Sequence, residues 1–209
     1  MKSVFHAPKR IAIIGSALGG GAAQVIDAIS RGSGQIPIGV FDNHPKAINR
    51  EILGVQVVGS SEDLLKAYEN SVFDAAVIAI GNLPLRKAVY EQLIAASIPL
   101  CNVIDKDAVV SQSARIGVGN VLLCHSYLGP DVIIGDNCYV ITGSKINHDS
   151  RLGSHCYLST GVSIAGRVQV GSMGKFDTAS GAAPDCLIPS GSYLMPGQIA
   201  TTQSFPKQS

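Results

Sequence analysis

The sequence contains no tryptophan, and only 5% of its 209 residues are aromatic. Charged residues make up 15%, and 16 Lys and Arg residues nearly balance 15 Asp and Glu residues, so the net charge is +1. Without a surplus of positive charge, the chain lacks the electrostatic footprint of a nucleic-acid-binding or membrane-surface protein. No apolar run reaches the roughly 18 residues that a membrane-spanning helix needs, so we expect no membrane insertion.

The sequence also lacks closely spaced cysteines, because none of its five cysteines belongs to a CxxC pair. An odd number of widely spaced cysteines favours reduced thiols over disulfides or a zinc site. The first residues lack the long apolar region of a secretion signal. Together these features predict a cytoplasmic protein without a structural metal.

Strand and helix signals alternate over residues 9 to about 104. Short aliphatic runs that end in glycine or an acid predict buried parallel strands at 9–15, 36–42, 75–81 and 99–105. Helical spacing of apolar residues and helix-start signals predict helices at 22–29, 60–70 and 86–96. This alternation predicts an α/β domain over residues 1–105, with a small Rossmann-like parallel sheet and helices on its faces.

A six-residue period replaces this alternation from about residue 106. Eleven aliphatic residues follow one another at this spacing without a gap: Val110, Ile116, Leu122, Leu128, Ile134, Val140, Ile146, Leu152, Leu158, Ile164 and Val170. Small residues often stand directly after each aliphatic residue and two positions before it. Each unit therefore predicts one short strand and one corner, and three units close an eighteen-residue coil with the aliphatic side chains stacked inside. A sandwich with regular turns would not keep a strict spacing of six.

Five segments carry a resemblance to a known family: IAIIGSALGGG, IGVFDN, REILGVQVVGS, AIGN and INHDSRLGSHCYLSTGVSIAGRVQVG. The repeat resembles that of the hexapeptide acyltransferases, which implies an all-β, left-handed parallel β-helix over residues 106–209. The domain in front of it resembles the nucleotide-sugar-binding domain of the sugar acetyltransferases of the PglD and NeuD type. The resemblance implies a homotrimer that uses acetyl-CoA as cosubstrate to acetylate a nucleotide-linked 4-amino sugar, or the hydroxyl of a sialic acid.

His148 and Asp149 are the leading catalytic candidates. Acetyl transfer from a thioester needs a group that removes a proton from the attacking amine or hydroxyl, and a neutral imidazole suits this task near neutral pH. In the resembling family a histidine followed by an acid serves as general base at this position. Asp149 would orient the ring or raise its basicity, if the chain turns there. Gly166 matches the family glycine whose backbone N–H stabilises the oxyanion of the tetrahedral intermediate. The alternatives are a solvent-facing histidine and an ordinary corner glycine.

The sequence departs from the family at its second histidine. Tyr157 occupies that position, and its hydroxyl can donate and accept a hydrogen bond, so we assign it to the substrate site. His155 lies two positions earlier, and the sequence leaves open whether it replaces the missing histidine or lies on the surface.

The resemblance also implies where the coenzyme lies. The coenzyme arm would follow backbone groups of Thr178, Ala179 and Ser180, one coil after Gly166. Lys175 or Lys207 would pair with the coenzyme phosphates, unless each is simply solvated.

The ends of the front-domain strands carry a candidate ligand site. A glycine-rich turn, GSALGGG, follows the first strand and opens a helix, where backbone N–H groups can receive a phosphate. Because the carboxyl ends of parallel strands meet at one edge, residues after the second and third strands join this turn. The residues assigned to the site are Gly15, Ser16, Asp42, Asn43, Gly81 and Asn82. Taken singly, each is also explained as a turn glycine or a cap.

Other functions use parts of such a chain. One alternative is a zinc-type carbonic anhydrase, which would use histidine ligands such as His125, His148 and His155. Their separations of 23 and 7 residues do not place one ligand on each face of adjacent coils. A nicotinamide oxidoreductase would use the front domain, but GxGxxG is absent. A non-catalytic or metal-binding β-helix protein would not need the His-Asp pair. We therefore expect an acyltransferase with acetyl-CoA as cosubstrate and no metal.

Overall fold

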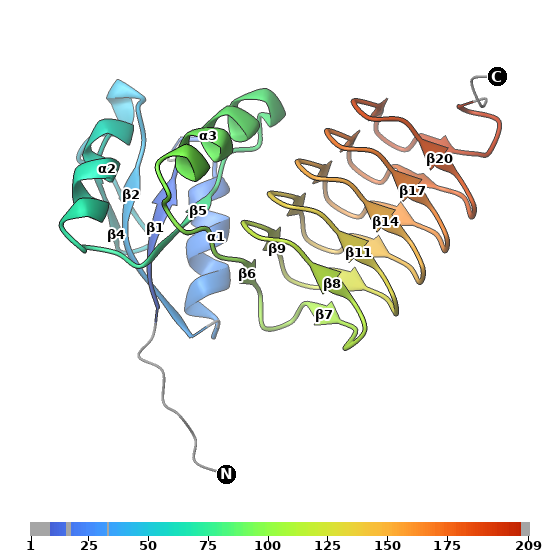
Figure 1. Ribbon diagram of the computed structural model, residues 1–209, viewed down its shortest axis with the longest axis horizontal. Coiled ribbons are helices and arrows are strands. Elements are labelled where there is room, and N and C mark those ends of the chain that lie inside the picture. The colour runs from blue at the N-terminus through green and yellow to red at the C-terminus, as the bar shows by residue number, and fades with distance from the viewer. Residues whose placement is uncertain (1–8, 16–17, 33, 206–209) are drawn as a thin grey trace, which may run out of the picture.

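The computed structural model describes residues 9–15, 18–32 and 34–205, which form a small α/β domain followed by a prism of stacked coils (Figure 1). The front sheet has the strand order β3-β4-β2-β1-β5. Its strands are β1 (Lys9–Ile14), β2 (Gln35–Phe41), β3 (Glu51–Ile52), β4 (Val55–Gly59) and β5 (Ala75–Ile78). The helices are α1 (Gly21–Ser30), α2 (Ser61–Glu69) and α3 (Leu83–Ala95), with a short 3-10 helix at Pro45–Ala47. Three predicted strands and all three predicted helices are confirmed.

Helices cover both faces of this sheet, which explains why its strands are continuously aliphatic. Ile11 and Ile13 of β1 pack in a core with α1. Ala12 and Ile14 point the other way, into a second core that contains residues of α2 and α3. In the part of the chain that the structure describes, no helix is long and apolar enough to cross a membrane.

One strand pair of the front sheet is antiparallel, which the sequence interpretation missed. β3 and β4 form a hairpin, and the two residues between them, Leu53 and Gly54, have φ angles of 46° and 83°. Two successive positive φ angles are the geometry that matches the twist of paired strands in a two-residue hairpin.

The predicted fourth strand at 99–105 is wrong in its pairing. Only Leu100 joins the front sheet, through a single bridge to Ala76. Val103–Ile104 forms β6, which pairs with Val121–Leu122 in the first coil of the prism. The six-residue register extends back from Val110 to Ile104, so the sequence did contain the signal for this assignment.

The prism consists of two-residue strands, each paired in parallel with the strand eighteen residues away. Three sheets result, with the orders β22-β19-β16-β13-β10-β7, β20-β17-β14-β11-β8 and β21-β18-β15-β12-β9-β6. The strands are β6 (Val103–Ile104), β7 (Val109–Val110), β8 (Arg115–Ile116), β9 (Val121–Leu122), β10 (Tyr127–Leu128), β11 (Ile133–Ile134), β12 (Tyr139–Val140), β13 (Lys145–Ile146), β14 (Arg151–Leu152), β15 (Tyr157–Leu158), β16 (Ser163–Ile164), β17 (Gln169–Val170), β18 (Lys175–Phe176), β19 (Gly181–Ala182), β20 (Leu187–Ile188), β21 (Tyr193–Leu194) and β22 (Ile199–Ala200). The predicted aliphatic residues form one core inside the prism.

The corners of the prism repeat one backbone conformation. Positive φ angles recur at every sixth residue: Gly119, His125, Asp131, Asn137, Gly143, Asp149, His155, Gly161, Arg167, Met173, Ala179, Asp185, Gly191 and Gly197. A second set of corner glycines lies against the next coil, since a Cβ on Gly153 would stand 2.5 Å from the backbone nitrogen of Ser172. The coils therefore stack as closely as their backbones permit.

A buried arginine joins the two halves of the chain. Arg86 of α3 is fully buried, and its guanidinium lies 4.9 Å from the ring centre of Tyr139. It donates hydrogen bonds to backbone carbonyls of both halves: Ile78, Ile80, Gly119, Asn137 and Cys138. Burial lowers the pKa of Arg86 to about 10, with Tyr139 opposing the change, so the side chain remains charged at neutral pH. Its charge is distributed over carbonyl oxygens, which fixes the front domain against the prism.

Candidate functional site

A cavity of about 630 Å³ opens at the carboxyl edge of the front sheet, between α2 and α3. Five of the residues predicted for the ligand site line it: Gly15, Asp42, Asn43, Gly81 and Asn82. The sixth, Ser16, lies outside the described residues. The deeper walls are apolar and include Phe41, Leu64, Ile80 and Leu93. The structure thus gathers the predicted residues around one cavity with a polar rim and an apolar interior.

Two of these polar residues also shape the rim through local hydrogen bonds. Asp42 accepts a hydrogen bond from the backbone N–H of His44 through Oδ1, at 2.8 Å. Asn43 bonds to Ser61 twice, accepting from its N–H at 2.7 Å and donating to its Oγ at 3.0 Å. The two bonds between Asn43 and Ser61 tie the end of β2 to the start of α2. Asn43 therefore both lines the rim and stabilises it.

Tyr157 of the prism does not line this cavity but lies beside Gly81, which does. A Cβ on Gly81 would stand 3.6 Å from the Cε2 carbon of Tyr157, which is van der Waals contact, so the loop lies directly beside the ring. The Tyr157 ring packs edge-on against Tyr139, with 5.7 Å between ring centres. Burial raises the pKa of Tyr157, which keeps its hydroxyl protonated at neutral pH. Asn82, next to Gly81, caps α3 by accepting from the N–H of Leu85 at 3.0 Å.

His155 lies between α3 and the prism rather than on the surface. Its ring contacts the ring of Tyr90 edge-on at 5.0 Å between centres. Its Nδ1 lies 3.0 Å from the amide nitrogen of Asn137, which makes Nδ1 an acceptor and the imidazole neutral. Burial, followed by the positive charge of Lys87, lowers the pKa of His155. The contacts assign His155 to the packing of the two halves.

His148 and Asp149 form a hydrogen-bonded pair at the corner between β13 and β14. The Nδ1 of His148 lies 2.8 Å from the Oδ2 of Asp149. Side chains of adjacent residues normally diverge, but Asp149 has a φ of 60°, which turns its carboxylate back toward the ring. Because a carboxylate only accepts, the pairing favours the neutral tautomer that carries its proton on Nδ1 and has its lone pair on Nε2. Both side chains are more than half exposed, at 52% and 56%.

Gly166 lies one coil after His148 and directly beneath its ring. A Cβ on Gly166 would stand 2.6 Å from Nε2 and 2.7 Å from Cε1 of His148, so the absent side chain is what gives the imidazole its place. The carbonyl of Gly166 accepts from the N–H of Asp185 at 3.2 Å. Its own N–H donates no hydrogen bond to any residue in the described ranges. The structure therefore brings His148, Asp149 and Gly166 together.

The coenzyme arm was predicted to follow backbone groups of Thr178, Ala179 and Ser180, and the N–H groups of all three already have partners. Thr178 donates to Oδ1 of Asp177 at 2.9 Å, and Ser180 donates to the Asp177 carbonyl at 3.0 Å. Ala179 donates to the carbonyl of Thr160 at 3.0 Å. A coenzyme arm at this corner would therefore meet other groups of these residues unless Asp177 moved.

Lys175 has partners within the prism, and the described residues offer no group of metal ligands. The Nζ of Lys175 lies 5.0 Å from the ring centre of Tyr193 and 4.0 Å from Oδ2 of Asp177, while Lys207 lies outside the described residues. Within residues 9–15, 18–32 and 34–205, no three His, Cys, Asp or Glu side chains are grouped so that they could hold a metal ion.

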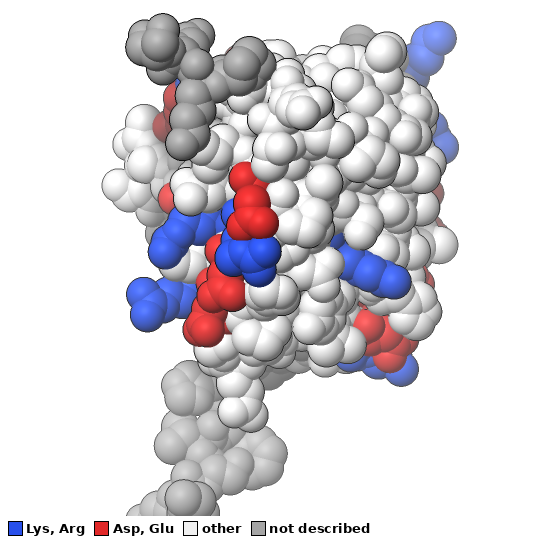
Figure 2. All heavy atoms as spheres, turned by 90° about the vertical axis from the view of Figure 1, so that its right-hand side faces the viewer, with Lys and Arg blue, Asp and Glu red and all other residues white. Residues whose placement is uncertain are grey.

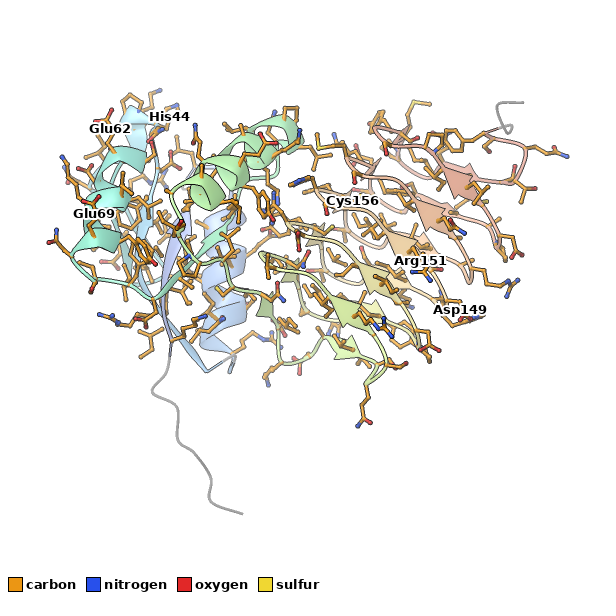
Figure 3. The ribbon with its side chains drawn as sticks, viewed as in Figure 1. His44, Glu62, Glu69, Asp149, Arg151 and Cys156 are labelled. Carbon is orange, nitrogen blue, oxygen red and sulfur yellow. The ribbon has the colours of Figure 1, made fainter. Side chains whose placement is uncertain are left out.

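The two halves of the candidate site lie on opposite sides of the prism. Tyr157 belongs to β15, in the sheet that faces α1 and the front domain. His148 follows β13 and precedes β14, so it lies at the corner between the other two sheets. Figure 3 shows Asp149 and Cys156, the neighbours of these residues in sequence, at different edges of the prism.

The interpretation of the sequence missed several residues near these sites. Ser61 lines the front cavity, and its only sequence signal was its place at the start of a predicted helix. Arg167 and Asp185 follow Asp149 at intervals of eighteen residues, so the coil length alone would have placed them on the same corner. Nothing in the sequence distinguishes Arg86 from a surface residue of its helix.

Comparisons with known proteins agree with this fold. The family described as the PglD N-terminal domain matches residues 10–93. Among solved structures, a histidine-to-alanine variant of GDP-perosamine N-acetyltransferase from Caulobacter crescentus, in complex with CoA and GDP-perosamine, is 27% identical. The match covers 90% of each chain with a TM-score of 0.69. No curated protein is similar enough in sequence to match.

Two further structures, both under 25% identical, show the fold alone. The acetyltransferase domain of PglB from Neisseria gonorrhoeae, in complex with acetyl coenzyme A, is 23% identical over 92% of this chain and 93% of its own, with a TM-score of 0.80. WeeI from Acinetobacter baumannii is 18% identical over 92% of this chain and 95% of its own, with a TM-score of 0.67.

A prism of hexapeptide coils with this front domain defines an acyltransferase with a left-handed β-helix, as expected. Within that class, residues 10–93 match the family of the PglD N-terminal domain, and the chain as a whole is similar to a sugar N-acetyltransferase.

Proposed function

We propose that this protein transfers the acetyl group of acetyl-CoA to the amine of a nucleotide-linked amino sugar, with a 4-amino sugar as the expected acceptor. The observation that carries the proposal is the His148–Asp149 pair stacked on Gly166. Support also comes from the relative that was crystallised with CoA and GDP-perosamine, which spans 90% of this chain at 27% identity.

His148 acts as the general base in the proposed reaction. The acceptor nitrogen attacks the thioester carbonyl carbon, and Nε2 of His148 takes the proton that the nitrogen loses. The N–H of Gly166, which has no partner among the described residues, donates to the oxyanion that forms on the carbonyl oxygen. When the intermediate collapses, the C–S bond breaks, and the proton passes from Nε2 to the departing thiolate. Asp149 holds the ring and stabilises the imidazolium formed in between.

The front cavity holds the nucleotide of the acceptor. Gly15 and Gly81 leave room for a phosphate group at the strand ends, and Asp42 is positioned for a ribose hydroxyl or a base. Tyr157 lies against Gly81 at the border of the prism, so the sugar extends over its hydroxyl. Bringing the amine and the thioester together then supplies a large part of the rate enhancement.

A homotrimer completes the site. His148 and the front cavity of one chain lie on opposite sides of the prism, so the base that acts on an acceptor in that cavity comes from a neighbouring subunit. The flat strand-lined faces suit a closed ring of three copies, each using one heterologous interface. The coenzyme then lies between the coils of two subunits. We place this assembly in the cytoplasm, which agrees with five free cysteines.

A coenzyme-release assay tests the reaction. We expect CoA release from acetyl-CoA with at least one member of a panel of nucleotide amino sugars, and His148→Ala should lower kcat roughly a hundredfold to ten-thousandfold. Release with sialic acids alone would change the assignment to O-acetylation. Activity of His148→Ala within a few-fold of the parent would remove His148 from the mechanism.

Mixed assemblies test the shared site. His148→Ala and Asp42→Ala chains, co-expressed, should form trimers in which one subunit supplies the intact cavity and its neighbour the intact base. Such mixtures should be more active than either variant alone. No gain on mixing, or a monomer mass in light scattering, would refute the shared site.

A further inference from the structure

Three charged residues occupy the same corner of successive coils. Asp149, Arg167 and Asp185 are spaced by eighteen residues and share φ angles of 60°, 60° and 63°. The coils at this corner are in direct contact, since the N–H of Arg167 donates to the carbonyl of His148 at 3.0 Å. Neighbouring strands lie about 4.8 Å apart, so Arg167 stands between one carboxylate in the coil before and another in the coil after. Figure 2 shows a basic side chain between acidic ones in a single column on this side of the molecule.

Arg167 pairs with only one of the two carboxylates. Its Nε lies 2.7 Å from Oδ1 of Asp185, and its Nη2 lies 2.9 Å from Oδ2 of the same residue. This is the two-pronged geometry in which guanidinium and carboxylate fit best. Asp149 lies within electrostatic reach of Arg167, yet it makes its hydrogen bond to His148.

The alternative pairing would interfere with the base. If the guanidinium turned to Asp149, it would compete with Nδ1 of His148 for the same carboxylate, and the ring would lose its fixed orientation. A second positive charge would also stand next to the imidazole at the step in which that ring becomes an imidazolium, which costs free energy. The contact between Arg167 and Asp185 prevents both effects.

We propose that Asp185 is a positioning residue of the acetyl-transfer site, which holds the guanidinium of Arg167 away from Asp149 so that Asp149 orients His148. This inference rests on the proposed function. It assigns Arg167 no contact with substrate. In this arrangement Asp185 restrains the side chain of Arg167, although Asp185 itself lies two coils after His148.

The test is a set of variants in which a second substitution repairs the first. Asp185→Asn should lower kcat about 10- to 100-fold, which is the loss found when a residue that orients a metal-binding side chain is removed. Arg167→Gln should stay within about twofold of the parent, because no competing cation remains. The double variant Arg167→Gln/Asp185→Asn should recover to the level of Arg167→Gln. A merely structural ion pair would instead make the double variant at least as impaired as Asp185→Asn.

Asp131→Asn is the matched control. Asp131 is an exposed aspartate on the same corner, one coil before Asp149, and it makes no ion pair with any residue in the described ranges. We expect its kcat to stay within about twofold of the parent. An equal loss in Asp131→Asn and Asp185→Asn would overturn the proposal, because the effect would then come from removing any acid at this corner.

A crystal structure of Asp185→Asn gives a readout that does not depend on turnover. We expect the guanidinium of Arg167 within hydrogen-bond distance of the Asp149 carboxylate. An Arg167 side chain that stays away from Asp149 would overturn the proposal. The two hypotheses fail separately: full activity in His148→Ala refutes the general base, whereas an inactive His148→Ala with a fully active Asp185→Asn refutes only the role of Asp185.

Discussion

The imidazole of His148 rests on the α-carbon of Gly166, in the position that a side chain at residue 166 would occupy. The contact joins two consecutive coils at one corner of the prism. It makes the base and the proposed oxyanion donor parts of one structural unit. Any residue larger than glycine at position 166 must displace the ring.

Gly166→Ala should therefore lower kcat at least about a hundredfold, as expected for a displaced general base, while the thermal stability changes little. Gly166 does not have a positive φ, so alanine fits its backbone. The backbone N–H remains in the variant, and the loss is therefore assigned to the ring. In a His148→Ala background the same substitution should cost almost nothing more, since the group that it displaces is gone. Losses that simply add would contradict this explanation.

Asp42→Ala should raise KM for the nucleotide-linked acceptor and leave KM for acetyl-CoA nearly unchanged. Loss of one hydrogen bond to a charged group costs about 1.5–3 kcal/mol, which corresponds to a KM about 10- to 150-fold higher. Glu62→Ala is the control, because Glu62 is an exposed acid of α2 that does not line the cavity. Weaker acetyl-CoA binding with unchanged acceptor binding would mean that the two domains have been assigned the wrong ligands.

Arg86→Ala should lower the free energy of unfolding by about 3 kcal/mol or more, because it leaves buried carbonyls of both halves without a donor and opens a cavity. Lys87→Ala is the matched control on the same helix. Lys87 is exposed and pairs with Glu91 at 3.2 Å, a contact worth at most about 0.5 kcal/mol. Urea midpoints at one fixed protein concentration measure both effects, and similar midpoints for the two variants would refute the role of Arg86.

His155 should make the protein less stable in acid. Burial lowers its pKa in the folded state, so the unfolded chain binds the proton more readily. The neutral form of His155 therefore contributes to the free energy of unfolding. This contribution is complete above the ordinary histidine pKa of about 6.5 and is lost as the pH falls through the folded-state pKa. The melting temperature should therefore fall less between about pH 7.5 and pH 5.5 in His155→Gln than in the parent.

His125→Gln is the matched control for this prediction, because His125 is exposed and shares the corner conformation of His155. Its pH dependence should equal that of the parent. A His155→Gln variant with the full acid sensitivity of the parent would show that other groups cause it.

The period of six predicted the prism because each short strand must present one aliphatic side chain inward and then turn. Leu158 and Ile164 illustrate this, since both occupy the predicted register and are buried. The strands of the front sheet were predictable for a similar reason, because an aliphatic run between two helical layers has few other uses. The His148–Asp149 pair could be proposed from sequence, but its geometry could not, since it depends on the φ of Asp149.

The contacts between the two halves of the chain could not be predicted from the sequence. Arg86 bonds to Asn137, which lies 51 residues away, and no local pattern signals that pairing. The sequence left open whether His155 lies on the surface, because its partner on α3, Tyr90, is also far away in sequence. The roles of such side chains can be assigned only when the position of α3 against the prism is known.

The strict coil length has a consequence for how this enzyme can vary between lineages. Inserting or deleting six residues after His148 would rotate everything downstream by one face, which would separate the ring of His148 from Gly166. Only insertions or deletions of whole eighteen-residue coils preserve the register of the prism. Between His148 and Gly166 even a whole coil cannot be inserted, because the two residues must lie on consecutive coils. Homologues should therefore differ in length by multiples of eighteen beyond this segment and keep the interval itself invariant.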